Sequence, residues 1–186
     1  MPAEPSIRGD VQLTRLFSRE VIAARVRELA AQISCDYAGR TLLLVGVLTG
    51  AFVFLADLMR QLTVPVEVEF VRLASYGTGA TSTGRVRLLQ DLTRSIVGRD
   101  VLIVEDILDT GLTLCYLLEQ LRVRQPASLH VCVLLHRHGP KPYALRPDYV
   151  GFEVADGFVV GYGIDYAEQH RHLPDIYTLT WRTASR

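Results

Sequence analysis

The sequence predicts an α/β fold, with a mainly parallel twisted sheet flanked by helices and a small hood. Apolar segments of strand length alternate along the chain with segments of helical spacing, which is typical of parallel sheets. The 186 residues, 49% of them hydrophobic, are enough for one domain with a full core. No internal repeat and no low-complexity segment interrupts the pattern.

In the first half of the chain, the first helix has the clearest start signal. Ser18 and Glu20 mark its beginning, and apolar residues then recur at helical spacing. Pro65 precedes a later strand. The elements expected in this half are helix 18–37, strand 42–48, helix 51–62 and strand 66–73.

The apolar run 41–56 has the composition of a membrane segment but not its length. It contains sixteen uncharged residues, whereas a spanning helix needs about 20. Gly46 and Gly50 interrupt it. We therefore interpret it as a buried strand, a turn and the start of a helix.

The second half begins with a loop rich in Gly, Ser and Thr over residues 74–84, which we expect to be long and mobile. A strongly apolar central strand follows at 100–104. The remaining elements expected are strand 86–89, helix 110–122, strand 129–135, a polar loop over 136–146, and short strands at 149–153, 159–161 and 177–181.

Charge and cysteine content limit the function classes. Twenty acidic and twenty basic residues balance, so no net field favours nucleic acid or membrane as a partner. Cys35, Cys115 and Cys132 are odd in number and widely spaced, which argues against a disulfide framework or a cysteine zinc site. The amino-terminal residues lack the apolar stretch of a secretory signal. These observations predict a cytoplasmic protein.

Residues 101–113, VLIVEDILDTGLT, carry the clearest functional signal. An apolar strand ends at Glu105 and Asp106, where ligands bind in open α/β sheets. Thr110, Gly111 and Thr113 open the next helix, whose free N–H groups and dipole favour a phosphate. Gly111 allows the backbone to approach the anion closely.

The two acids at this turn narrow the ligand class. Alone, each residue could simply end a strand or cap a helix. Together, carboxylates beside a phosphate site are explained by contacts to ribose hydroxyls or to a divalent cation. The turn therefore predicts a sugar-phosphate site.

This segment resembles the signature of type I phosphoribosyltransferases, which bind 5-phosphoribosyl 1-diphosphate. It lacks the Lys-Ser/Thr ending of a Walker loop. Further segments resemble hypoxanthine-guanine phosphoribosyltransferases in order and spacing, over most of residues 20–180: LVGVLTGAFVFLADL at 44–58, FVRLASYGTG at 70–79 and PDYVGFEVADGFVVGYGIDYAEQHRHLP at 147–174. The resemblance implies the type I phosphoribosyltransferase fold.

The resemblance also implies roles for individual residues. Asp109 would be catalytic, handling the proton at purine N7, and Ser75 and Tyr76 would form the tip of a closing lid. The turn 48–50 would bind diphosphate and carry an unusual cis non-proline peptide. The residues implied to bind 5-phosphoribosyl 1-diphosphate are Leu48, Thr49, Gly50, Ser75, Tyr76, Glu105, Asp106, Asp109, Thr110, Gly111, Leu112, Thr113 and Arg171.

On the base side, Phe158 would stack on the purine and the backbone of Val159 would contact it. The residues implied to bind the purine are Ile107, Arg137, Phe158, Val159 and Asp165, and those implied to bind Mg²⁺ are Glu105, Asp106 and Asp165. Metal and Arg171 would stabilise the leaving diphosphate.

The implied activity is purine salvage, in which phosphoribose passes to hypoxanthine or guanine to give IMP or GMP. The family usually forms homodimers or homotetramers. We expect an amino-terminal extension over 1–17, the catalytic domain over 18–181 with a hood from both ends of the chain, and a tail over 182–186.

Arg137 departs from the family pattern, which has lysine at this position to read the exocyclic oxygen of a 6-oxopurine. A planar guanidinium is not equivalent to an ammonium group, although it can donate to O6 and N7 together. Lys141, four residues later, is a weaker candidate for this role. The preferred base, whether hypoxanthine, guanine, xanthine or a non-purine base, therefore stays open.

Two further alternatives follow from the sequence. A regulator with the same fold would bind RNA or DNA, but zero net charge and short extensions disfavour it. Two His-Arg-His triplets, at 136–138 and 170–172, could bind a metal if they lay on strands. We favour their interpretation as basic loops near anionic ligands.

Overall fold

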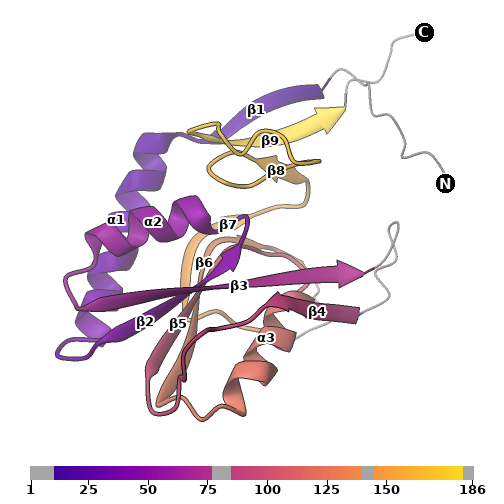
Figure 1. Ribbon diagram of the computed structural model, residues 1–186. Coiled ribbons are helices and arrows are strands. Elements are labelled where there is room, and N and C mark those ends of the chain that lie inside the picture. The colour runs from indigo at the N-terminus through magenta and orange to yellow at the C-terminus, as the bar shows by residue number, and fades with distance from the viewer. Residues whose placement is uncertain (1–10, 77–84, 140–144, 182–186) are drawn as a thin grey trace, which may run out of the picture.

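The computed structural model describes residues 11–76, 85–139 and 145–181. Its strands form two sheets, the smaller at the top of Figure 1. The larger sheet has the order β4-β3-β2-β5-β6-β7, and the smaller has β1-β9-β8. The elements are β1 (Val11–Phe17), α1 (Arg19–Asp36), β2 (Leu42–Leu48), α2 (Phe52–Gln61), β3 (Val66–Tyr76), β4 (Arg85–Gln90), β5 (Asp100–Leu108), α3 (Leu112–Arg122), β6 (Ser128–Arg137), β7 (Tyr149–Val154), β8 (Phe158–Val160) and β9 (Ile176–Trp181).

The larger sheet confirms the predicted fold class. Strands β3, β2, β5, β6 and β7 pair in parallel, and only β4 runs antiparallel, against β3. Helices cover both of its faces (Figure 1). The apolar run 41–56 is divided among β2, a turn and α2, as predicted. Within the described ranges, no helix is both long and apolar enough to cross a membrane.

The alternating direction of side chains along the central strands explains why helices pack on both faces of the larger sheet. In β2, Leu42 and Leu44 pack with α1 and α2, whereas Leu43 and Val45 pack with α3. All four are fully buried. Successive strand side chains point to opposite faces, so a sheet covered on both sides needs apolar residues at every position. That requirement explains the unbroken apolar runs in the sequence.

Three strands, β3, β5 and β6, are longer than the sequence indicated by three or more residues. β3 continues to Tyr76 because β4 pairs with its end, so the first residues of the predicted loop 74–84 are strand. β5 continues to Leu108, which pairs with His136 of β6, and β6 continues to Arg137, which pairs with Val154 of β7. Residues 77–84 of the predicted lid and Lys141 lie outside the described residues.

The strand order creates a crevice at the carboxyl ends of β2 and β5. From β2 the chain goes to β3 on one side, whereas β5 lies on the other side and leads on to β6 and β7. Connections leaving two neighbouring parallel strands in opposite directions open a ligand-binding crevice between them. The turns after β2 and β5 both border this crevice.

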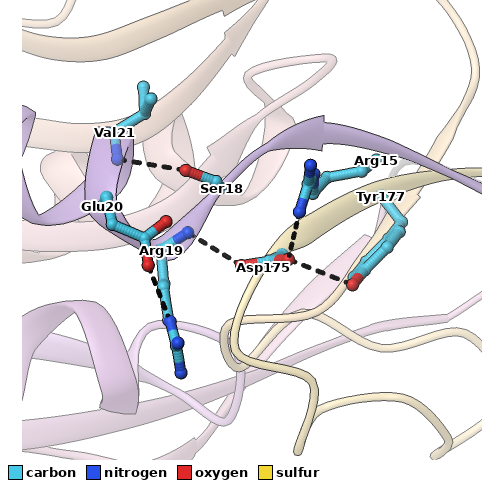
Figure 2. Close-up of polar contacts among 7 residues, drawn as sticks. All are labelled: Arg15, Ser18, Arg19, Glu20, Val21, Asp175 and Tyr177. Carbon is cyan, nitrogen blue, oxygen red and sulfur yellow. Dashed lines mark hydrogen bonds and ion pairs between the residues drawn. The ribbon is translucent and has the colours of Figure 1, made fainter.

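The smaller sheet joins the two ends of the described chain. Residues 11–17, assigned from the sequence to an amino-terminal extension, form β1 and pair with β9. At the junction, the buried Asp175 carboxylate accepts hydrogen bonds from the Arg19 N–H (2.8 Å) and the Tyr177 hydroxyl (3.2 Å), and Arg15 lies 3.6 Å away (Figure 2). Asp175 therefore ties the start of β9 to the start of α1.

Candidate active site

A cleft of about 510 Å³ lies at the carboxyl ends of β2 and β5. It brings together most of the residues that the sequence assigned to sugar-phosphate binding. Its wall consists of Val47, Leu48, Gly50, Leu73, Glu105, Asp106, Ile107, Leu108, Asp109, Thr110, Gly111, Thr113, Leu114 and Asp165.

The amino terminus of α3 is open toward this cleft. Gly111 has a left-handed conformation (φ 86°), which glycine adopts without strain, and no side chain caps the helix. The Thr110 hydroxyl accepts one hydrogen bond, from the Leu112 N–H at 3.4 Å. By contrast, α1 is capped by Ser18, whose hydroxyl accepts from the Val21 N–H (Figure 2). The uncapped end of α3 can therefore donate to an anion.

Glu105 and Asp106 form the acidic wall of the cleft. The Glu105 carboxylate accepts the Asp106 N–H at 3.1 Å, and the Asp106 carboxylate accepts the Ile107 N–H at 2.9 Å. Burial raises the pKa of both carboxyl groups, and the neighbouring Asp106 charge raises the pKa of Glu105 further. When two carboxyl groups are this close and this poorly hydrated, a cation or hydroxyl donors bound to them stabilise their charged forms.

The turn after β2 lies directly against these acids. A Cβ added to Gly50 would lie 1.8 Å from Oδ2 of Asp106, so any larger residue there would displace the Asp106 carboxylate. On the other side, a Cβ added to Gly163 would lie 2.6 Å from the Gly50 oxygen. The Leu48–Thr49 peptide is cis, as the resemblance implied. Three distant segments thus meet at Gly50.

Arg171 stabilises the third of these segments. Its Nη1 donates to the Gly163 oxygen at 2.9 Å, and its Nη2 lies 2.7 Å from Oδ1 of Asp165. The Asp165 carboxylate also accepts the Glu168 N–H at 2.8 Å. The positive charge of Arg171 opposes the rise in the pKa of Asp106. A guanidinium is therefore close to the acidic wall.

A second cavity, of about 360 Å³, adjoins the first. The two share Ile107, Asp109 and Asp165 in their walls. The other residues of the second wall are Arg137, Asp156, Gly157, Phe158, Val159 and Ile164. Asp109 therefore lies at the junction of the 510 Å³ cleft and a smaller cavity with an aromatic wall.

Arg137 reaches across the second cavity from the end of β6. Because β6 pairs with β5, Arg137 lies next to Asp109, and its Nε is 3.0 Å from Oδ1 of Asp109. Its Nη1 donates to the oxygens of Ala155 (3.1 Å) and Gly157 (2.7 Å). The geometry of the Asp109 contact is not that of a hydrogen bond, so among the described residues the buried Nε–H has no acceptor.

Phe158 is the exposed aromatic of this cavity, with 51% of its surface accessible. Its ring contacts Tyr166 (centroids 5.5 Å) and Trp181 (5.0 Å), which also contact each other (5.8 Å). Neither Tyr166 nor Trp181 was singled out from the sequence. The signal for Trp181 is the register of β8 against β9, and Tyr166 lies in the turn between these strands; no sequence pattern provides either contact.

The remaining candidate residues fall into two groups. The backbones of Ser75 and Tyr76 form the end of β3, but their side chains are outside the described part of the chain. The first His-Arg-His triplet is split: Arg137 faces Asp109, whereas His136 contacts Glu153 at 3.0 Å and lines a different cavity. Within the described ranges, no group of three His, Cys, Asp or Glu side chains is arranged to hold a metal ion.

Comparison with known proteins identifies relatives along nearly the whole chain. Residues 12–167 match the phosphoribosyl transferase domain family. The chain is 44% identical to the hypoxanthine-guanine phosphoribosyltransferase of Bacillus subtilis, covering 88% of this chain and 91% of the relative. It is 48% identical to the hypoxanthine phosphoribosyltransferase of Haemophilus influenzae, covering 85% and 90%. The crystal structure of a hypoxanthine phosphoribosyltransferase from Staphylococcus aureus superposes with a TM-score of 0.86 at 41% identity, covering 90% of this chain and 91% of that one.

Proposed function

We infer the chemistry of the two cavities from one premise, that the chain belongs to the hypoxanthine-guanine phosphoribosyltransferase family. The protein transfers the phosphoribosyl group of 5-phosphoribosyl 1-diphosphate to a purine base in purine salvage. With hypoxanthine or guanine as acceptor, the products are IMP or GMP and diphosphate.

The observation that carries this proposal is the position of Asp109 between the two cavities. In the reaction, the bond from ribose C1 to diphosphate breaks and a bond from C1 to the purine forms. The base loses a proton, and a carboxylate at the junction of the sugar and base sites is in position to accept it. Asp109 is therefore the proposed general base.

The larger cleft suits 5-phosphoribosyl 1-diphosphate. The open end of α3 would bind the 5′-phosphate through backbone N–H groups of residues 109–113. The turn at 48–50 and Arg171 would receive the diphosphate, because Arg171 is the cation nearest the acidic wall in the contacts described above. Fixed donors at the leaving group stabilise the negative charge that develops on it.

The donor set fits a magnesium ion that arrives with the substrate. Glu105, Asp106 and Asp165 supply hard oxygen ligands in one cleft, but they form no preassembled cage among the described residues. Mg²⁺ typically binds through one or two carboxylates plus substrate phosphates and water. When bound, it would neutralise diphosphate charge, while Glu105 and Asp106 would also accept ribose hydroxyls.

The smaller cavity suits a flat base with acceptor atoms on one edge. Phe158 provides an exposed ring for stacking. The guanidinium of Arg137 lines the same cavity and would donate to O6 or N7 of a 6-oxopurine.

The experiment that tests the proposal is a panel of bases with 5-phosphoribosyl 1-diphosphate and Mg²⁺, followed by diphosphate release. Hypoxanthine, guanine, xanthine and a pyrimidine control should be assayed together. Turnover with hypoxanthine or guanine is the expected result. If none of the three purines is converted, the salvage activity is refuted. Binding of RNA or DNA instead would favour a regulator.

Because Arg137 stands where the family has lysine, the same panel also tests which base the protein prefers. The guanidinium satisfies Ala155 and Gly157 as well as facing the base, and a lysine ammonium at this position could not do both with the same geometry. Replacing Arg137 by lysine should therefore change the ratio of kcat/KM values among hypoxanthine, guanine and xanthine. An unchanged ratio would remove Arg137 as a reader of the base.

Family membership also suggests the assembly and location of the protein. We propose a homodimer or homotetramer in the cytoplasm. Light scattering after size-exclusion chromatography measures the assembly, and a monomer at micromolar concentration would contradict it.

A further inference from the structure

Trp181 lies behind the base cavity rather than in it. The wall of that cavity includes Phe158 but neither Trp181 nor Tyr166, although all three belong to the described residues. Trp181 keeps 42% of its surface accessible, so it is not a core residue held by close packing on every side. Its clearest contacts are with the two other rings.

Strand register explains why these rings meet. Phe158 lies opposite Leu179 in the antiparallel β8–β9 ladder, and Trp181 is two residues further along β9 on the same face. Diagonal neighbours in an antiparallel pair are about 7–8 Å apart at the backbone, within reach of aromatic side chains. The contact is therefore built into the pairing of the two strands.

The geometry of the contact leaves Phe158 open to a ligand. Trp181 meets Phe158 at 88° and Tyr166 meets it at 75°. Edge contacts of this kind are favourable and directional, and neither neighbour stacks in parallel on Phe158. The ring is half accessible but contacted from two directions, which limits its rotation.

Tyr166 extends the cluster to the other wall of the site. It follows Asp165, whose carboxylate is paired with Arg171. A bridge between Tyr166 and Gln169 closes the turn that carries it. The three rings therefore connect the stacking residue with the turn whose acid borders both cavities.

We propose that Trp181 is a positioning residue for base binding: it holds the ring of Phe158 in the orientation that receives the purine. This proposal rests on the proposed function. It predicts a specific kinetic effect, because loss of the contact should weaken base binding while leaving the sugar-phosphate cleft intact. It also makes Trp181 a reporter, since it is the single tryptophan of the chain.

The kinetic test compares W181A, W181F and T180A with the wild type. W181A should raise KM for hypoxanthine and guanine roughly three- to tenfold, with KM for 5-phosphoribosyl 1-diphosphate within about twofold of wild type. W181F retains a ring and should recover most of the loss. T180A, on the opposite face of β9 and also exposed, is the matched control and should behave as wild type.

The outcomes separate this proposal from the proposed function. Absence of turnover in the wild type would refute the function itself. Wild-type turnover with an unchanged base KM in W181A would refute the positioning role, as would equal rises in the KM values of both substrates. Melting temperatures identify any variant that fails to fold.

Tryptophan fluorescence provides a second measurement that needs no Trp181 variant. IMP is titrated into the wild type, T180A and F158A, with excitation where the nucleotide does not absorb and free tryptophan amide as the blank. A saturable change in emission is expected in wild type and T180A, and a much smaller amplitude at saturation in F158A. An unchanged emission in the wild type at saturating IMP, or the same amplitude in F158A, would overturn the proposal.

Discussion

Two glutamates of the larger sheet, with similar and small exposed surface, have opposite electrostatic environments. Glu69 is 8% exposed and Glu105 is 7% exposed. The Glu69 carboxylate accepts hydrogen bonds from the hydroxyl (2.8 Å) and N–H (3.2 Å) of Thr93, and Arg94 lies 3.5 Å away. Glu105 lies beside Asp106 and, among the described residues, forms no ion pair. The pKa of Glu69 is lowered, first by the Thr93 hydroxyl, whereas burial raises the pKa of Glu105 well above its usual range.

The difference distinguishes a structural carboxylate from one available to a ligand. Glu69 has its partners within the protein, so its charge stabilises the fold. Glu105 accepts the Asp106 N–H but has no hydroxyl donor or cation among the described residues, and it lies in the cleft. Its charge therefore costs stability until a ligand or cation arrives. Strongly shifted acids in clefts are candidates for function on this physical ground.

The largest expected effect is the loss of activity on replacing Asp109. Its matched comparison is Asp91, another aspartate that faces an arginine. Asp91 forms two aligned hydrogen bonds with Arg124 (2.8 and 2.7 Å), whereas the contact of Asp109 with Arg137 is not aligned as a hydrogen bond. Replacing Asp109 by asparagine removes the proposed proton acceptor. The expected result is a fall in kcat of roughly a hundred- to ten-thousandfold, measured in the diphosphate assay, with much smaller changes in substrate binding.

The matched control is D91N, which disrupts an ion pair far from the cleft. Its turnover should equal that of wild type, and its free energy of unfolding should fall by less than about 1 kcal/mol, as for other surface pairs. Equal kcat values in D109N and wild type would remove Asp109 as the general base.

A smaller effect is expected on stability, and its sign should differ between the two glutamates. Replacing Glu69 by glutamine weakens charge-assisted hydrogen bonds and should lower the free energy of unfolding by about 1–2 kcal/mol. Replacing Glu105 by glutamine removes a buried charge and should raise it by about 1 kcal/mol, as active-site substitutions often do. Denaturant unfolding at neutral pH without ligand or Mg²⁺ measures both.

The two glutamate substitutions should also differ in their effect on activity: E105Q should impair it, whereas E69Q should not. E105Q should weaken use of 5-phosphoribosyl 1-diphosphate, raising its KM about tenfold, because an acceptor for the ribose hydroxyls or for magnesium is lost. E69Q should keep the wild-type KM. If both substitutions destabilise the protein equally, the distinction between the two environments is wrong.

The fold was predictable because its signals are local. The uncharged run 42–48 and the apolar run 101–104 favour strands covered on both faces, and they form β2 and part of β5. Strand ends were less predictable, because β5 is extended by pairing with β6, and β6 by pairing with β7. The pairing of residues 11–17 with β9 joins the two ends of the chain, and no local pattern indicates such a contact.

The grouping of residues at the candidate site could be predicted where a single segment contains them. The turn at 105–113 contains acids, a glycine and hydroxyls in one stretch, and the cleft includes nearly all of them. The contacts of Gly50 with Asp106 and of Phe158 with Trp181 were not predictable, because they depend on three-dimensional proximity. The family resemblance identified Phe158, but only strand register identifies the residue behind it.

The smallest expected effect is the pH dependence of the free energy of unfolding that Glu69 contributes. Its pKa is lowered in the folded protein, so the stability it contributes is fully present above the unfolded-state pKa and is lost as the pH falls through the folded-state value. The difference in free energy of unfolding between wild type and E69Q should therefore be largest at neutral pH and shrink as the pH falls below the ordinary pKa of glutamate, about 4.3. Replacing Thr93 by valine removes the main cause of the lowered pKa, and should shift this loss to higher pH. A difference that stays constant over the whole range would mean that the hydrogen bonds of Glu69, rather than its charge, account for its contribution.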